Sequence, residues 1–299
     1  MNNIKNEFSI KDLENLTGIK AHTIRIWEKR YNLLSPKRTD TNIRYYDLGD
    51  FQKLMNVSYL NNNGYKISKI ATLDDKHIPS LANEIAQKDQ TENHAINAFK
   101  LAMINFDQHL LYKTYDSLLK EKTFKGIFYD IFIPLLNEIG LLWQTTTITP
   151  AHEHFLVAFI KQKILLNIEL IQSKQSQCSE ETYVLYLPDN EIHEIGLLFI
   201  NYEIVSNNHR CISLGASVPM DNLSEILKYH EDVTFISYFT VKPEKEKIKK
   251  YLLDFNNTLL KSTKSKLWVL GKMLEHIDTK SLPNKIEAFT SIKEVVKKL

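Results

Sequence analysis

The spacing of hydrophobic residues changes twice along this 299-residue chain, and each change predicts a different kind of structure. Residues 1–74 carry short helical patterns separated by turn residues. Residues 91–175 repeat apolar side chains at three- and four-residue steps with few glycines, which is typical of a helical bundle. Residues 180–299 alternate short apolar runs with amphipathic segments, the pattern of a parallel sheet covered by helices. Residues 75–90 are expected to form a linker between the first two parts.

The first part opens with two predicted helices joined by a turn that contains glycine. Ser9 is the expected N-cap of the first helix, because Asp12 follows three residues later, close to the spacing of a capping box. The second helix is predicted over Ala21–Tyr31. Two short helices joined in this way indicate a helix-turn-helix, whose second helix enters the major groove of DNA.

Charge supports a polyanion-binding role for this part of the chain. The whole chain has a net charge of +2, but residues 1–74 hold 12 Lys and Arg against 8 Asp and Glu. Within Lys20–Tyr46 the count is 7 against 2. Turn residues with basic flanks in Pro36–Tyr46 predict a β-wing, and Asp47 is expected to cap a further helix. A basic module on a near-neutral body is typical of a nucleic-acid-binding head.

Three motifs in this order resemble the winged helix-turn-helix of MerR-type regulators. They are Thr23-Ile-Arg-Ile-Trp-Glu-Lys-Arg-Tyr31, Leu33-Leu-Ser-Pro-Lys-Arg38 and Arg44-Tyr-Tyr46. The resemblance implies double-stranded DNA as a partner, with Trp27 and Tyr46 packing the core. It implies contacts from the second helix through Thr23, Arg25, Arg30 and Tyr31, and from the wing through Lys37, Arg38 and Arg44. Most MerR proteins continue into a long coiled-coil helix, whereas no sustained heptad pattern follows here, so oligomerisation is expected to use another surface.

The middle part predicts about four helices. They cover Thr91–Ile104, Asp107–Glu121, Phe124–Trp143 and Thr149–Gln172. Pro134 lies inside the third helix and is expected to kink it.

The last part predicts a flavodoxin-like (Rossmann-type) sheet. The expected strands are Thr182–Leu187, Cys211–Leu214, Val233–Phe239, Lys266–Leu270 and Ile286–Phe289. Open α/β sheets bind ligands where strands end and loops begin, and the first such loop contains Glu191, His193 and Gly196. An imidazole there can ligate a metal while a carboxylate holds its other nitrogen, and a glycine allows close approach to the helix. From these residues alone, a solvated loop with a capping carboxylate is the commoner explanation.

The spacing Glu-x-His-x-x-Gly after a first strand resembles the signature of cobalamin-binding domains, as in methionine synthase and corrinoid mutases. The resemblance implies that His193 ligates cobalt from below, with Glu191 as its partner. It places Ser237, in Ser237-Tyr-Phe-Thr240, in the groove for the nucleotide tail. Proteins of that family have a Gly-Gly pair after the fourth strand. Gly271 matches its first glycine, and Lys272 takes the place of the second. That lysine is expected to extend outward, to meet a phosphate of the tail, or to block it.

Trp143, then nine intervening residues, then Glu153-His154 resembles the cap motif of light-sensing cobalamin repressors. In that family these side chains cover the upper face of adenosylcobalamin, so Trp143, Glu153 and His154 are expected to bind the cofactor here. The family commonly has a histidine directly after the tryptophan, where this chain has Gln144. His152 and His154 are candidate substitutes for it.

The sequence therefore predicts a DNA-binding transcriptional regulator, a repressor by resemblance, controlled by a bound cobalamin and assembling as a dimer or tetramer. Two alternatives are a MerR-type regulator that has lost cobalamin and answers to a protein partner, and a corrinoid methyl carrier. No Gly-x-Ser-x-Gly or phosphate loop supports hydrolase or kinase chemistry, and no enzyme is expected. Two cysteines, no signal peptide and no long apolar run predict a cytoplasmic protein without a membrane partner.

Overall fold

A computed structural model describes residues 7–86, 92–144, 148–174, 181–230 and 232–299. The chain forms two compact units, Met1–Phe159 and Ile160–Leu299. The boundary between them falls within helix α10 (Pro150–Gln172).

The first unit begins with the predicted helix pair, α1 (Ile10–Thr17) and α2 (Ala21–Tyr31). The capping box is present, since the Ser9 hydroxyl accepts from the Asp12 amide at 3.2 Å and the Asp12 carboxylate accepts from the Ser9 amide at 2.7 Å. The side chains of Ile24 and Trp27, at 0% and 8% exposure, pack this face of α2 into the core.

Replacing Ser9 by alanine is expected to lower the free energy of unfolding of this unit by about 1 kcal/mol, because the first turn of α1 loses a side-chain acceptor. Urea denaturation followed by circular dichroism measures the change. Ser9→Asn, which keeps an acceptor at the N-cap, is the control and should stay near wild type. An equal loss in both variants would contradict the role of the cap.

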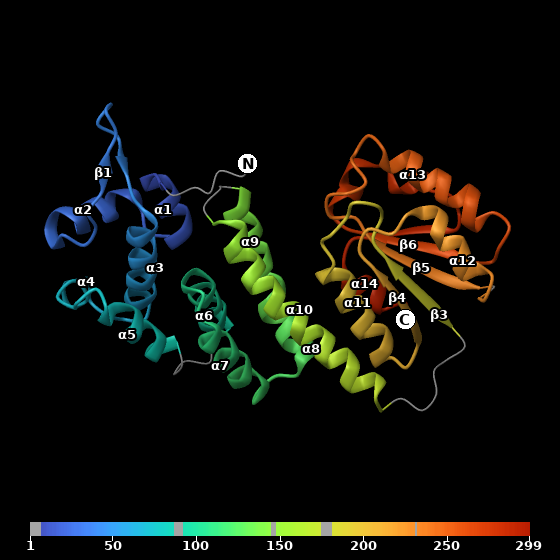
Figure 1. The fold of residues 1–299 in the computed structure, drawn as a ribbon, viewed down its shortest axis with the longest axis horizontal. Helices are drawn as coiled ribbons and strands as arrows, with labels where there is room; N and C mark the ends of the chain where they lie inside the picture. Colours follow the sequence, from blue (N-terminus) through green and yellow to red (C-terminus); the bar gives the residue numbers. More distant parts are fainter. Residues whose placement is uncertain (1–6, 87–91, 145–147, 175–180, 231) are drawn as a thin grey trace. The chain divides into compact units, whose positions relative to one another are not determined.

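A two-stranded hairpin, β1 (Lys37–Arg38) and β2 (Arg44–Tyr45), follows and projects beyond α1 and α2 (Figure 1). Helix α3 (Leu48–Asn62) begins at its N-cap Asp47, as predicted. Phe8 stacks on Phe51 at 4.9 Å and pairs with the fully buried Tyr46, so the start of the chain, the hairpin and α3 share one core.

The segment predicted as a linker contains regular structure. After α4 (Ile67–Ile70), helix α5 (His77–Ala86) occupies much of residues 75–90. Ile78 and Ala82 are buried at 1% and 0% exposure, and α5 packs on α3 and α6 (Glu92–Asn105). The polar run Asp74–Lys76 and Pro79 suggested a linker, but Pro79 lies in the first turn of the helix, where a missing N–H is tolerated. Residues 87–91 lie outside the described part.

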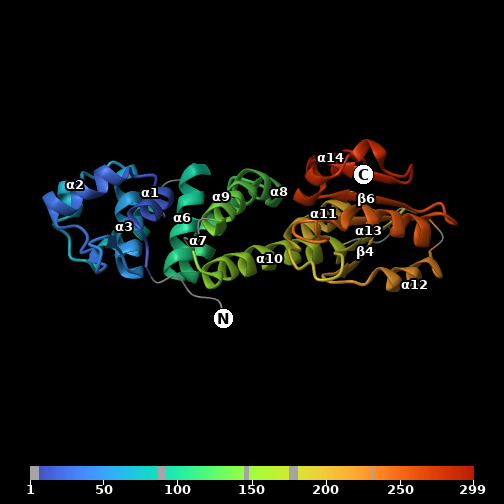
Figure 2. The ribbon, with the colours of Figure 1, turned by 90° about the horizontal axis from the view of Figure 1, so that it is seen from above.

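The helices of the middle part follow the predicted pattern. Helix α6 packs on α7 (Gln108–Leu119), and Figure 2 shows the two next to each other. The third predicted helix consists of α8 (Phe124–Ile127), a π-helical turn η1 (Phe128–Phe132) and α9 (Ile133–Gln144). Pro134 has no N–H and its ring clashes with the preceding turn, so the irregularity lies just before it, where the Ile133 amide bonds the Phe128 carbonyl.

The second unit contains a parallel five-stranded sheet in the order β4-β3-β5-β6-β7, which is the flavodoxin-like order. The strands are β3 (Thr182–Tyr186), β4 (Arg210–Gly215), β5 (Val233–Tyr238), β6 (Lys266–Leu270) and β7 (Ile286–Phe289). Each lies within one residue of its predicted bounds. β3, β5 and β6 are mostly buried and read as apolar runs, whereas the edge strands β4 and β7 are only partly buried.

Helices cover both faces of the sheet (Figure 1). One face packs on α11 (Ile195–Ser206) and α14 (Ile292–Val296). The other carries a core built around Tyr186, Phe235 and Phe255, covered by α13 (Ile248–Phe255) with its π-helical continuation η3 (Asn256–Leu260) and by η2 (Met220–Leu223) and α12 (Ser224–Leu227). The turns η4 (Lys272–His276) and η5 (Thr279–Ser281) follow β6. In the described residues, no helix is long and apolar enough to span a membrane.

Candidate functional site

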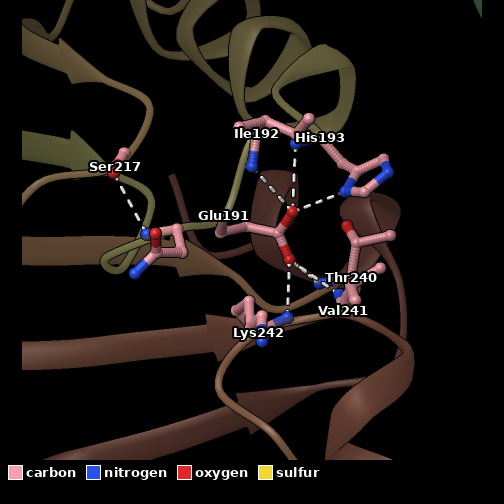
Figure 3. A network of polar contacts seen from close by, with 8 residues as sticks. Glu191, Ile192, His193, Ser217, Thr240, Val241 and Lys242 are labelled. Carbon is pink, nitrogen blue, oxygen red and sulfur yellow. Dashed lines mark hydrogen bonds and ion pairs between the residues drawn. The ribbon is translucent and has the colours of Figure 1, made fainter. Parts of the chain in front are cut away.

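The loop between β3 and α11 is organised around Glu191, whose side chain is fully buried. Its Oε1 accepts from the backbone amides of Ile192 at 2.9 Å and His193 at 3.0 Å. Its Oε2 accepts from three consecutive amides of the loop after β5, Thr240, Val241 and Lys242, at 3.2, 2.6 and 2.8 Å (Figure 3). One carboxylate therefore joins two loops at the carboxyl edge of the sheet.

These hydrogen bonds keep Glu191 ionised. Burial by itself would raise the pKa of the carboxyl group, but hydrogen bonds from the His193 ring and from the amides of Lys242 and Val241 outweigh it and lower the pKa to about 2. Glu191 is thus an acceptor at every working pH.

His193 is oriented by this carboxylate. Its Nδ1 lies 2.5 Å from Glu191 Oε1, and because the carboxylate can only accept, Nδ1 carries the proton. In the neutral imidazole the lone pair is then on Nε2, which lies on the far side of the ring from Glu191 (Figure 3). The side chain is 46% exposed, so it combines a fixed tautomer with access from solvent. A carboxylate–histidine pair of this kind is the usual support for a metal-ligating imidazole.

The donor set limits which metal group fits. Among the described residues, no cluster of three or more His, Cys, Asp or Glu side chains could hold an ion. His193 would supply a single nitrogen, so the metal must bring its remaining ligands with it. A corrinoid, whose ring nitrogens surround the cobalt, meets that requirement.

The other predicted residues of this unit lie nearby but contact the protein itself. Ser237, on β5, is fully buried and donates to the Tyr186 carbonyl at 2.9 Å. Gly196, in the first turn of α11, faces the ring of Tyr238. Gly271 has φ 118° and lies against the backbone of Phe239. Lys272 is exposed, which agrees with the expectation that its side chain extends outward.

The predicted cap residues belong to the first unit. Trp143 and Gln144 end α9, and their side chains lie outside the described part. Glu153 is half-buried and His154 exposed, both in the first turns of α10. His152 is 2% exposed, stacks on Phe106 at 4.6 Å between ring centroids and bonds Thr149 Oγ1 at 2.8 Å. Of the two substitutes considered for Gln144, His154 is therefore the accessible one.

In the helix-turn-helix, Arg25 and Arg30 are exposed on α2, opposite its buried face, while Thr23 and Tyr31 are partly buried. On the hairpin, Lys37 pairs with Asp47 at 3.3 Å and Arg38 bonds Asn42 at 2.6 Å. Arg44 Nε lies 3.5 Å from Glu28, which also accepts from the buried Tyr46 hydroxyl. Trp27 and Tyr46 pack the core as predicted.

Sequence reasoning missed the amides of Thr240–Lys242 and the ring of Tyr238. Backbone amides leave no signal in side-chain patterns, and their partner Glu191 is about fifty residues away in the chain. Tyr238 was visible only as the middle residue of Ser237-Tyr-Phe.

Two family models match the chain in tandem. The MerR HTH family regulatory protein model covers residues 8–76, and the B12 binding domain model covers residues 95–166. The chain is therefore similar to MerR-type regulators in its head and to B12-binding domains in its middle part.

Two curated proteins and one solved structure are similar to this chain over most of its length. The HTH-type transcriptional repressor CarH of Myxococcus xanthus is 26% identical, over 82% of this chain and 80% of CarH. The repressor CarA of the same organism is 21% identical, over 79% of this chain and 78% of CarA. The monomethylamine corrinoid protein of Methanosarcina barkeri has a similar fold, with a TM-score of 0.53 at 13% identity over 69% of this chain and 97% of that one.

Proposed function

We propose that this protein is a transcriptional repressor whose binding to operator DNA is controlled by a bound cobalamin. The observation that carries the proposal is the Glu191-held His193, which offers one oriented nitrogen at the ligand-binding edge of the sheet. The same chain carries a MerR head, and relatives with this domain combination are named as repressors.

In this proposal His193 would ligate the cobalt and Glu191 would hold the imidazole in position. Gly196, Ser237 and Gly271 are the other residues of this unit that would hold the cofactor. Trp143, Glu153 and His154 would contact it from the first unit, and adenosylcobalamin is the expected form. When bound, the cofactor supplies a cobalt ion with an exchangeable upper ligand. The protein residues orient that group and exclude water from it.

The DNA side of the proposal rests on the exposed basic residues of the head. Thr23, Arg25, Arg30 and Tyr31 on α2, with Lys37, Arg38 and Arg44 on the hairpin, contact the duplex. Assembly into a dimer or tetramer would place several heads on one operator and so raise the effective concentration of each. A cofactor that shifts assembly would thereby shift operator affinity.

The test is a dark absorption spectrum of purified protein mixed with adenosylcobalamin and desalted, for wild type and His193→Ala. We expect the wild type to retain the corrinoid, with the absorption spectrum typical of a cobalt that is ligated by histidine and not by the tail base. The variant is expected to lack this spectrum, because it has no imidazole at position 193. Illumination of the same samples, with gel-shift assays on DNA before and after, tests light as the signal. A wild-type protein that retains no corrinoid of any class would overturn the proposal in favour of a regulator controlled by a protein partner.

A further inference from the structure

Tyr238 fills the space between the end of β5 and the first turn of α11. A Cβ atom placed on Gly196 would lie 2.6 Å from Cε2 and 2.8 Å from Cδ2 of the Tyr238 ring. Real side chains do not approach so closely, so the ring occupies room that exists only because residue 196 is glycine. This crevice is three residues from His193, at the sheet edge where α/β domains bind ligands.

Two neighbouring positions contact protein atoms as well. Ser237, which the resemblance assigned to the tail groove, is fully buried and its hydroxyl donates to the Tyr186 carbonyl of the neighbouring strand. Gly271 lies against the backbone of Phe239, since a Cβ atom on it would lie 2.4 Å from the Phe239 carbonyl oxygen.

The Tyr238 side chain is also partly buried. Burial raises the pKa of Tyr238, so the phenol stays neutral. Moving it outward would expose the ring and leave a void beside Gly196, both of which are unfavourable.

A complete cobalamin carries a nucleotide tail on the lower face of its ring. If His193 takes the lower position at cobalt, the tail base is displaced and must lie beside that histidine. In this structure the Tyr238 ring stands in the adjoining crevice. We propose that Tyr238 is a specificity residue that excludes the nucleotide tail, so that the site prefers corrinoids of the tail-less cobinamide class. This inference rests on the proposed function.

The test compares adenosylcobinamide with adenosylcobalamin in equilibrium binding, in the dark, on the full-length chain. Wild type is expected to bind cobinamide about 10-fold or more tighter than cobalamin, because a filled pocket rejects the larger ligand. Tyr238→Ala is expected to gain about 10-fold or more for cobalamin, with cobinamide changed by less than about 3-fold. Tyr238→Phe keeps the ring and is the matched control, expected to retain the wild-type preference.

The test does not depend on the variants alone, because the preference of the wild type for cobinamide over cobalamin is measured without them. Tyr238→Leu is a second variant with a smaller side chain, should Tyr238→Ala fail to fold. Gly196→Ala probes the same contact: it should destabilise the wild type and be tolerated together with Tyr238→Ala. Equal binding of both corrinoids by wild type, unchanged in Tyr238→Ala, would overturn this inference and leave the proposed function standing. Failure of both corrinoids to bind wild type and every variant would overturn the two together.

Discussion

Replacing Glu191 by alanine is expected to lower the free energy of unfolding of the unit 160–299 by about 3 to 5 kcal/mol. The carboxylate accepts from five backbone amides and one imidazole, and its own side chain is fully buried. A buried amide left without an acceptor costs about 1 to 3 kcal/mol, and because these amides are only partly buried and the two loops can relax, the total stays below the sum.

Hydrogen exchange of the β3 and β5 amides during urea denaturation isolates this unit from the rest of the chain. Glu191→Gln keeps the shape of the side chain, but its NH₂ group points two donor hydrogens at backbone amides that are donors themselves. An intermediate loss of unfolding free energy is therefore expected. Glu194→Ala is the control, because its partly exposed carboxylate pairs with Lys161 at the surface, an interaction worth less than about 1 kcal/mol. Similar losses in Glu191→Ala and Glu194→Ala would show that the two loops are not held by Glu191.

Strands β3, β5 and β6 were predictable because burial on both faces makes each of them an apolar run. The edge strands β4 and β7 are only partly buried, and they were predicted from their place in the alternation of strand-like and helical segments. The order of the strands follows from the alternation of strands and helices, and His193 falls at the ligand edge for the same reason. Amphipathic spacing begins at Glu244 in the sequence, but helix α13 begins at Ile248, because residues 244–247 form a turn in which the Lys247 amide donates to the Glu244 carbonyl. Local periodicity does not distinguish such a turn from a first helical turn.

Of the contacts in the candidate site, the sequence predicted the Glu191–His193 pair and little else. Glu191 was expected to hold His193, and it does, yet its larger role is to join two loops through amides that any sequence would offer. Gly196 was expected to make room for a ligand, and the room is taken by Tyr238. The motif indicates only that there is space beside Gly196. Which side chain fills that space depends on the tertiary packing between β5 and α11.

Removing both exposed arginines of α2, as Arg25→Ala/Arg30→Ala, is expected to lower affinity for duplex DNA by about 100-fold, or about 1.4 kcal/mol for each side chain. Both side chains are exposed while Ile24 and Trp27 anchor the opposite face of the helix, so truncation leaves the core intact. If both contact phosphates, the slope of log affinity against log salt should also become shallower by about 2.

The measurement is fluorescence anisotropy over a range of salt, with a duplex enriched from a random pool by the wild-type chain. Lys11→Ala/Lys20→Ala removes the same charge from the same unit, but both ammonium groups lie 3.3 Å from Glu14 and neither is on the exposed face of α2. That control should lose less than about 5-fold, through long-range charge alone. If the two double variants lose affinity equally and with the same salt slope, the head attracts DNA by net charge alone, and α2 is not the helix that enters the groove.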